Sequence, residues 1–279
     1  VMVTQRRVDT APNCGNMLCA IGPFAIEHGL VNAGSPMTRV RIRNLNTNTF
    51  VDSDVMTPGG RVRYDGDTAI DGVPGTAAPI KLTFLNAAGA KTGRLLPTGR
   101  ARDEFDGVEV TCIDMAMPMV LMHAEALGKT GYESPAELDA DSAFLQRLER
   151  IRLQAGLAMG LGDVSQMVIP KPVLLAPARH GGTLSVRYFM PHNCHRSVAA
   201  TGAIGLATAC ALPGCVAQDI APIEGEALVR LEHPGGQIEV SLQPAADGNP
   251  EKLRASLVRT ARRLFSGEVY IPSLRRTGT

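Results

Sequence analysis

The chain has 279 residues, enough for two domains of ordinary size with an ample apolar core. Its 28 basic and 27 acidic residues leave a net charge of +1, and aromatic residues make up only 4%, so the basic surface and stacking platforms of a nucleic-acid-binding protein are not expected. No apolar run reaches membrane-spanning length, and six cysteines without a CxxC pair predict neither a disulfide framework nor a metal site. A reducing cytoplasm is the default compartment.

The first part of the chain reads as one helix followed by several short strands. Apolar residues recur at helical spacing from Met17 to Ile26, and Gly29 ends this helix. Residues 37–45 alternate apolar with basic side chains, which predicts a half-buried strand. Further strands are expected at 49–56, 61–67 and 79–85, with glycine turns between them.

The character of the chain changes after Gly107, where buried strands are expected at 108–113 and 119–122. The clearest amphipathic helix is 142–158, and a second glycine-marked helix start comes at 199–205 and continues to Leu212. The remaining expected elements are strands at 166–175, 183–190, 226–232 and 236–242, a basic helix around 251–265 and a last short strand at 268–271.

Each half of the chain therefore carries a loop of small residues that leads into a helix, surrounded by short strands. This similarity predicts two domains, residues 1–107 and 108–279, with both helix starts at one cleft. The last strand, at 268–271, can pair with the first domain. Because residues 1–4 read as the inside of a strand, we expect the N-terminal domain to lack its first part.

The loop before the first helix places Cys14 at the first helical turn. Pro12 forbids a helix before it, and Asn13 can cap the helix that follows. The free backbone N–H groups and the positive end of the helix dipole favour a thiolate at Cys14. Such a site can hold a carboxylate against the amides of Gly15 and Asn16, beside a sulfur base. The alternative is a buried structural cysteine.

The second helix start offers another anion site, formed by the amides of Thr201, Gly202 and Ala203. The Thr201 side chain can contact a ligand or cap its own helix. Cys194 is either a second acid near the cleft or a small core residue. No spaced partner completes a metal site around it. Candidate counter-charges, each of which can instead be solvated or structural, are Lys171, Arg187, His192 and His195.

The stretches 9–18 (DTAPNCGNML) and 22–27 (GPFAIE) resemble the signature of the methylaconitate isomerase (PrpF-like) family, which shares the diaminopimelate epimerase fold. The resemblance covers essentially the whole chain. Residues 110–120 with 131–133 are most similar to the 4-oxalomesaconate tautomerases of gallate degradation. Further similar stretches are 93–99, 191–195, 200–205 and 259–263.

The resemblance implies an α+β fold of two epimerase-like domains, each a curved mixed or antiparallel sheet around a central helix. It also implies a cofactor-free proton shift next to carboxylates, with Cys14 as the acid/base. Ala199 occupies the place of the second cysteine of the epimerases, which argues against two-cysteine racemisation. In the methylaconitate isomerases the partner is an upstream lysine, which we expect before Val1.

The predicted function is therefore a keto–enol or 1,3-allylic tautomerisation of an unsaturated tricarboxylate such as 4-oxalomesaconate. The alternatives are a 2-methylaconitate cis–trans isomerase, an amino-acid racemase or epimerase, and a non-catalytic small-acid-binding protein. We expect no cofactor, no metal, no nucleic-acid or membrane partner, and a possible homodimer. The predicted site consists of catalytic Cys14 and the substrate-binding residues Asn13, Gly15, Asn16, His192, Thr201, Gly202 and Ala203.

Overall fold

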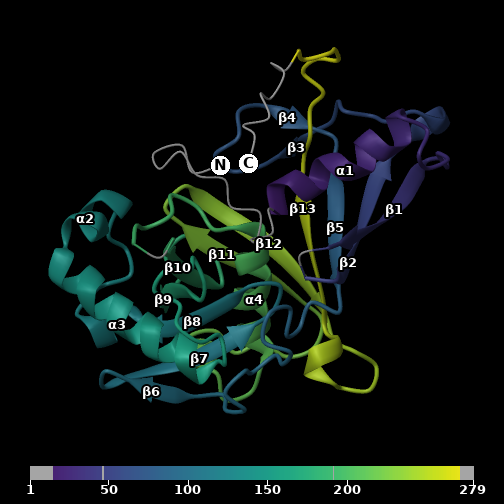
Figure 1. Cartoon of the computed structure of the whole chain (residues 1–279). Coiled ribbons are helices and arrows are strands. Elements are labelled where there is room, and N and C mark those ends of the chain that lie inside the picture. The colour runs from purple at the N-terminus through teal and green to yellow at the C-terminus, as the bar shows by residue number, and fades with distance from the viewer. Residues whose placement is uncertain (1–14, 46, 191, 271–279) are drawn as a thin grey trace, which may run out of the picture.

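One long mixed sheet runs through the molecule (Figure 1). The computed structural model describes residues 15–45, 47–190 and 192–270. The helices are α1 (Gly15–Glu27), α2 (Pro135–Ala140), α3 (Ser142–Ala158) and α4 (Ala200–Ala211), with short 3-10 turns η2 (Pro58–Gly60), η3 (Ala124–Leu127), η4 (Val216–Asp219) and η5 (Pro250–Lys252). The strands are β1 (Met37–Asn44), β2 (Thr49–Met56), β3 (Thr68–Ala69), β4 (Thr76–Ala77), β5 (Ile80–Leu85), β6 (Asp103–Phe105), β7 (Val108–Asp114), β8 (Pro118–His123), β9 (Lys171–Pro177), β10 (Leu184–Tyr188), β11 (Ala227–His233), β12 (Gly236–Gln243) and β13 (Arg254–Arg259).

The strand order within the described residues is β1-β2-β5-β13-β12-β11-β10-β9-β8-β7-β6. Neighbouring strands are antiparallel, except that β8 pairs with β9 and β10 with β11 in parallel. This mixed sheet with few helices confirms the predicted α+β class. Because the sheet runs from β1 to β6 without a break, the division into domains at residue 107 stays a prediction.

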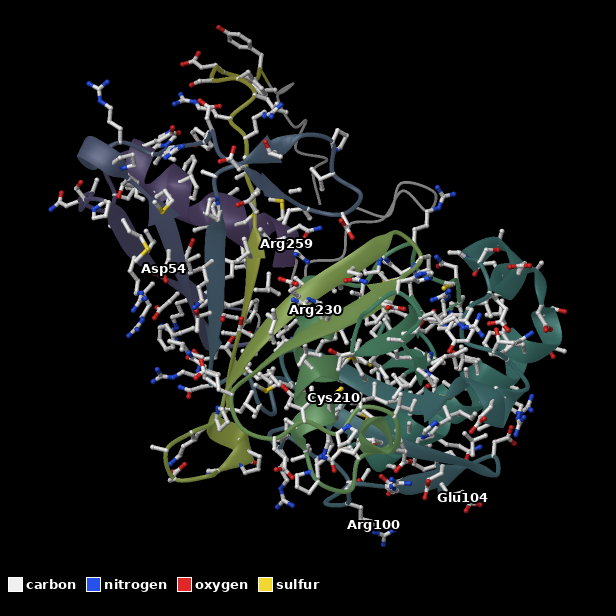
Figure 2. The ribbon with its side chains drawn as sticks, turned by 180° about the vertical axis from the view of Figure 1, so that it is seen from behind. Asp54, Arg100, Glu104, Cys210, Arg230 and Arg259 are labelled. Atoms are coloured by element: carbon white, nitrogen blue, oxygen red, sulfur yellow. The ribbon has the colours of Figure 1, made fainter. Side chains whose placement is uncertain are left out.

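The outer face of β1 and β2 is polar. Val40 and Ile42 point into the core, whereas Arg39 and Arg41 point outward. In the register of the two strands Arg39 lies opposite Asp54 and Arg41 opposite Asp52, and the guanidinium groups bind the carboxylates at 2.7 and 2.8 Å. Asp54 is labelled in Figure 2. Arg41 holds the pKa of Asp52 below its usual range, and the cross-strand pairs fix the register.

α4 is buried along almost its whole length, and the sheet curves around it (Figure 1). It is apolar on all sides, as expected for a helix enclosed by a core. α1 differs, because it buries Leu18, Ala25 and Ile26 against the sheet but leaves Met17 and Phe24 more than half exposed. Both helices contribute to one apolar core that also includes the inner faces of β1, β2, β5 and β11–β13.

A second apolar core lies between α3 and the strands β7–β9. α3 has the bounds predicted from its sequence pattern, and Phe144, Leu148 and Ile151 form its buried face. Arg152 on the same helix is fully buried. Its guanidinium group binds both carboxylate oxygens of Glu149 at 2.6 and 2.7 Å. It also donates to three backbone carbonyl groups of the 164–169 loop, so the buried charge is fully paired.

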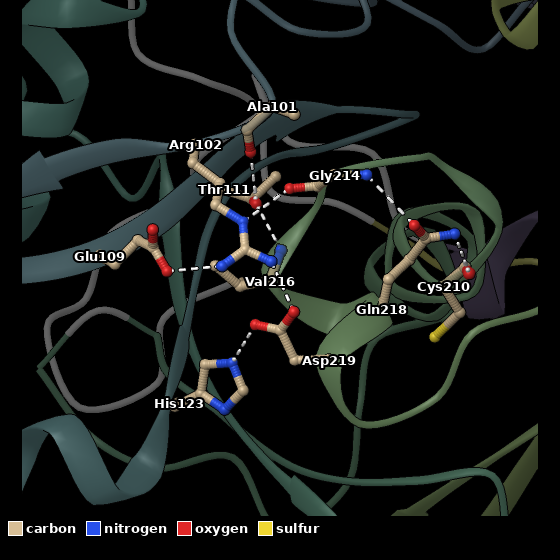
Figure 3. A network of polar contacts seen from close by, with 10 residues as sticks. All are labelled: Ala101, Arg102, Glu109, Thr111, His123, Cys210, Gly214, Val216, Gln218 and Asp219. Atoms are coloured by element: carbon tan, nitrogen blue, oxygen red, sulfur yellow. Dashed lines mark hydrogen bonds and ion pairs between the residues drawn. The ribbon is translucent and has the colours of Figure 1, made fainter.

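A polar network fixes the far end of α4 (Figure 3). The Arg102 guanidinium group binds Glu109 at 2.6 Å and Asp219 at 2.5 Å, and donates to the carbonyl of Gly214 at 2.8 Å. Gln218 donates to the Cys210 carbonyl at 3.3 Å, which satisfies an acceptor in the last turn of α4. The network therefore ties the end of α4 to β6 and β7.

Three sequence predictions about local structure are wrong. The basic helix around 251–265 is instead the turn η5, the strand β13 and an extended segment. β13 lies between β5 and β12, where Ala255 and Leu257 face the core and Val258 faces outward, which is the two-residue period of a strand. Residues 61–67 form no strand, and within the described residues none forms at 268–270.

Candidate active site

The first turns of α1 and α4 meet in the structure. A Cβ atom placed on Gly15 would lie 2.5 Å from the Cβ of Ala200 and 3.6 Å from the backbone nitrogen of Thr201. Glycine at position 15 therefore lets the two helix starts touch. Asn16 is exposed beside this contact. Cys14 and Asn13 lie outside the described residues, so their roles stay predictions.

The start of α4 carries no side-chain cap. Ala199 is the N-cap residue, and it has no side-chain acceptor for the first amides of the helix. The Ala203 amide donates to the Ala199 carbonyl at 2.8 Å, so it is not among the free donors. The amides of Thr201 and Gly202 precede this first i to i−4 bond and remain candidates for an anion. Thr201 does not cap the helix, because its buried Oγ1 has no partner among the described residues.

Several buried basic side chains lie around these helix starts. Lys171 at the start of β9 and His233 at the end of β11 are each less than 9% exposed. Arg187 on β10 is also buried, but it points to the other face of the sheet, where it donates to the Glu133 carbonyl at 2.7 Å. Arg259 ends β13 beside α1 (Figure 2). The adjacent residue Thr260 accepts a hydrogen bond from the Cys19 thiol at 3.4 Å. A buried cation such as Lys171 is expected where an anion binds.

The side chains of His195 and His233 lie near each other and near Lys171 and Arg259. Ser197 N–H donates to His195 Nδ1 at 2.9 Å, and Gly235 N–H donates to His233 Nδ1 at 3.1 Å. Burial, followed by the charge of Lys171, lowers the pKa of His195. Burial also lowers the pKa of His233 to about 4, with further contributions from nearby cations. Both imidazoles are therefore neutral near pH 7, each with Nε2 as its N–H donor.

Two candidates from the sequence lie elsewhere. His192 is 66% exposed, and its Nδ1 faces the Glu149 carboxylate of α3 at 3.9 Å, on the side of the second core. Cys194 belongs to that second core, and burial raises the pKa of its thiol to about 12, which does not suit a proton-transfer group near pH 7. Cys194 is therefore a core residue.

His233 and Arg259 were not among the predicted site residues. The position of His233 at the end of a predicted strand was visible in the sequence, but Arg259 fell in a predicted helix, and the approach of the two residues depends on the sheet order. The Asp71 carboxylate lies close enough to His233 to affect its pKa. It accepts a hydrogen bond from the backbone amide of Gln237 at 2.7 Å. A groove of about 280 Å³ has both Asp71 and Arg259 in its lining.

The described part of the chain contains no group of three potential metal ligands. In the same residues no helix has the length and apolar character to cross a membrane.

Comparison with known proteins shows what this chain is similar to. "Putative isomerase YbhH" of Escherichia coli K12 is 62% identical over 98% of this chain and 77% of its own length. The 4-oxalomesaconate tautomerase of Pseudomonas putida is 51% identical over 97% of this chain and 75% of its own length. A crystal structure of methylitaconate-delta-isomerase superposes with a TM-score of 0.84 at 31% identity, covering 95% of this chain and 74% of that one.

The family model described as PrpF protein matches residues 1–272. Together with relatives named as isomerases that match nearly the whole chain, this shows that the chain belongs to the PrpF protein family and is an isomerase.

Proposed function

We propose that the protein catalyses a cofactor-independent proton shift on an unsaturated tricarboxylate such as 4-oxalomesaconate. The observation that carries this proposal is the meeting of two helix starts near the basic residues Lys171 and Arg259. The amides of Thr201 and Gly202 suit one carboxylate, and the cations Lys171 and Arg259 suit the remaining negative charge. The relative at 51% identity is named for the tautomerisation of this substrate.

In the proposed reaction the Cys14 thiolate removes a proton from the carbon next to a carboxylate. The electron pair of that C–H bond moves into the conjugated system and forms an enolate. A proton then returns to a different carbon or to the oxygen, so the substrate and product have the same composition. Binding of the carboxylates orients the acidic C–H bond and stabilises the developing charge.

Two related reactions are alternatives to this proton shift. The superposition on methylitaconate-delta-isomerase favours a 1,3-allylic shift in a related acid, such as 2-methylaconitate, as the second candidate. Ala199 at the cap of α4 supplies no thiol, which disfavours a two-cysteine racemase. A cytoplasmic location, where Cys14 would stay reduced, and a homodimer belong to the same proposal.

The test is proton NMR in D₂O with 4-oxalomesaconate as substrate. We expect the wild-type protein to introduce deuterium at one carbon, and Cys14→Ser to lose at least about a hundredfold in rate, as expected when a general base is removed. Cys19→Ser is the matched control, because Cys19 is buried in α1, five residues further along the chain, and its thiol donates to the carbonyl of Asn16 at 2.8 Å. Exchange that survives in Cys14→Ser would exclude the thiolate mechanism. Turnover of 2-methylaconitate alone would favour the second candidate.

A further inference from the structure

Two buried hydroxyl groups at the start of α4 have no hydrogen-bond partner among the described residues. They are Tyr188 Oη and Thr201 Oγ1, and both side chains are only 1% exposed. A buried hydroxyl without a partner costs free energy, so most such groups in folded proteins are paired. Two unpaired hydroxyls at an uncapped helix start indicate that a ligand supplies the missing acceptor.

The ring of Tyr188 lies directly against the first turn of α4. A Cβ atom on Gly202 would lie 2.5 Å from Cε2 and 3.2 Å from Oη of Tyr188. Only glycine at position 202 therefore allows the hydroxyl to come so close to the helix backbone. Oη therefore lies beside the first turn of α4, in which the amides of Thr201 and Gly202 precede the first i to i−4 bond.

The surroundings favour an anion as that acceptor. The ring of His195 lies edge-on against Tyr188, with ring centroids 6.2 Å apart. The charge of Lys171 contributes to the lowered pKa of His195, and His195 contributes to the lowered pKa of His233, so both groups lie near this ring. Burial raises the pKa of Tyr188 far above its usual range, so its hydroxyl keeps the proton that a donor needs. An uncharged donor in a desolvated pocket binds a carboxylate strongly.

We propose that Tyr188 is a substrate-binding residue whose hydroxyl, together with that of Thr201, donates to one carboxylate of the substrate at the start of α4. The identity of the substrate rests on the proposed function, whereas the carboxylate as ligand class rests on these donors. Neither hydroxyl has a hydrogen-bond partner among the described residues, so we expect that its removal does not destabilise the ligand-free protein.

The experiment measures binding of tricarballylate, a saturated tricarboxylate that cannot tautomerise, by calorimetry and by the rise in melting temperature. The variants are Tyr188→Phe and Thr201→Val, which keep the side-chain shape and remove only the hydroxyl. Thr208→Val is the matched control. Thr208 is equally buried on the same helix, but its hydroxyl donates to the Ile204 carbonyl at 2.8 Å.

We expect Tyr188→Phe and Thr201→Val to bind tricarballylate about tenfold more weakly than wild type, the usual value of a hydrogen bond to a charged group. Thr208→Val should bind as wild type does, and the empty Tyr188→Phe protein should melt no lower than wild type. Wild-type affinity in Tyr188→Phe, no binding by the wild type, or a lower melting temperature of the empty variant would each overturn the proposal. Turnover of 4-oxalomesaconate, measured separately, decides the proposed function.

Discussion

Single residues from distant parts of the sequence build the candidate site. Gly15 and Gly202 owe their importance to close approach, since a side chain on either would overlap Ala200 or Tyr188. His233, Arg187 and Arg259 come from three strands, yet the two arginines contribute to the low pKa of His233. These residues act through their contacts with one another, which no local sequence pattern reports.

His233 gives a prediction for the pH dependence of stability. Its pKa is about 4 in the folded protein and about 6.5 in the unfolded chain. The unfolded chain therefore binds more protons between these values, and the stabilisation present above pH 6.5 is lost as the pH falls towards 4. We expect His233 to account for about 3 kcal/mol of the loss in unfolding free energy over this range.

Urea unfolding of wild type and His233→Gln at pH 4, 5, 6 and 7 measures this contribution. The difference between the two proteins should be largest at pH 7 and should shrink as the pH falls. Parallel curves for the two proteins would show that His233 does not titrate with the lowered pKa.

Among the secondary-structure elements, β13 joins the two parts of the sheet. It pairs with β5 through Ile80–Phe84 and with β12 through Ser241–Gln243. It thereby joins strands from the early part of the chain to strands from the late part. A basic helix is predicted here from the sequence, but the apolar residues follow the period of a strand with one face in the core.

The central position of β13 predicts slow hydrogen exchange. Ala255 and Ser256 are paired with strands on both sides and the rest of β13 with one, whereas β6 at the edge of the sheet has one neighbour and three residues. Hydrogen–deuterium exchange measured by mass spectrometry should show peptides covering 254–259 among the slowest and those covering 103–105 among the faster ones. Fast exchange across 254–259 would contradict the strand and favour the helix expected from composition.

On the scale of the whole molecule, the contact between Gly15 and Ala200 connects two helices that each pack on a different part of the sheet. α1 contacts β1, β2 and β5, and α4 contacts β11–β13 and β7. The relative position of the two helices therefore determines the shape of the candidate site between their first turns.

This contact predicts a compensating pair of substitutions. Gly15→Ala should destabilise the protein by about 1–3 kcal/mol, because its Cβ would overlap the Cβ of Ala200. Ala200→Gly in the same chain removes that overlap, so the double variant should regain part of the loss beyond the sum of the single effects. Denaturant unfolding of the four proteins in the double-mutant cycle measures the coupling. Additive effects would show that the two helix starts do not touch.

The sequence by itself determined the elements whose burial follows a local period and the loop motifs that identify the family. α3 has its predicted bounds, β1 has its predicted inner and outer faces, and the start of α4 lies where the small residues precede it. In each case the side chains that face the core recur at a regular spacing, so the sequence alone predicts the element and its buried face.

Only the tertiary structure decided which residues surround the helix starts. It placed β13 in the sheet, directed His192 towards α3, bonded the Ala203 amide within its helix and brought His233 and Tyr188 to the candidate site. Strand order and helix contacts join residues far apart in the chain, and their free energy depends on packing between elements. A local sequence pattern therefore does not predict that packing.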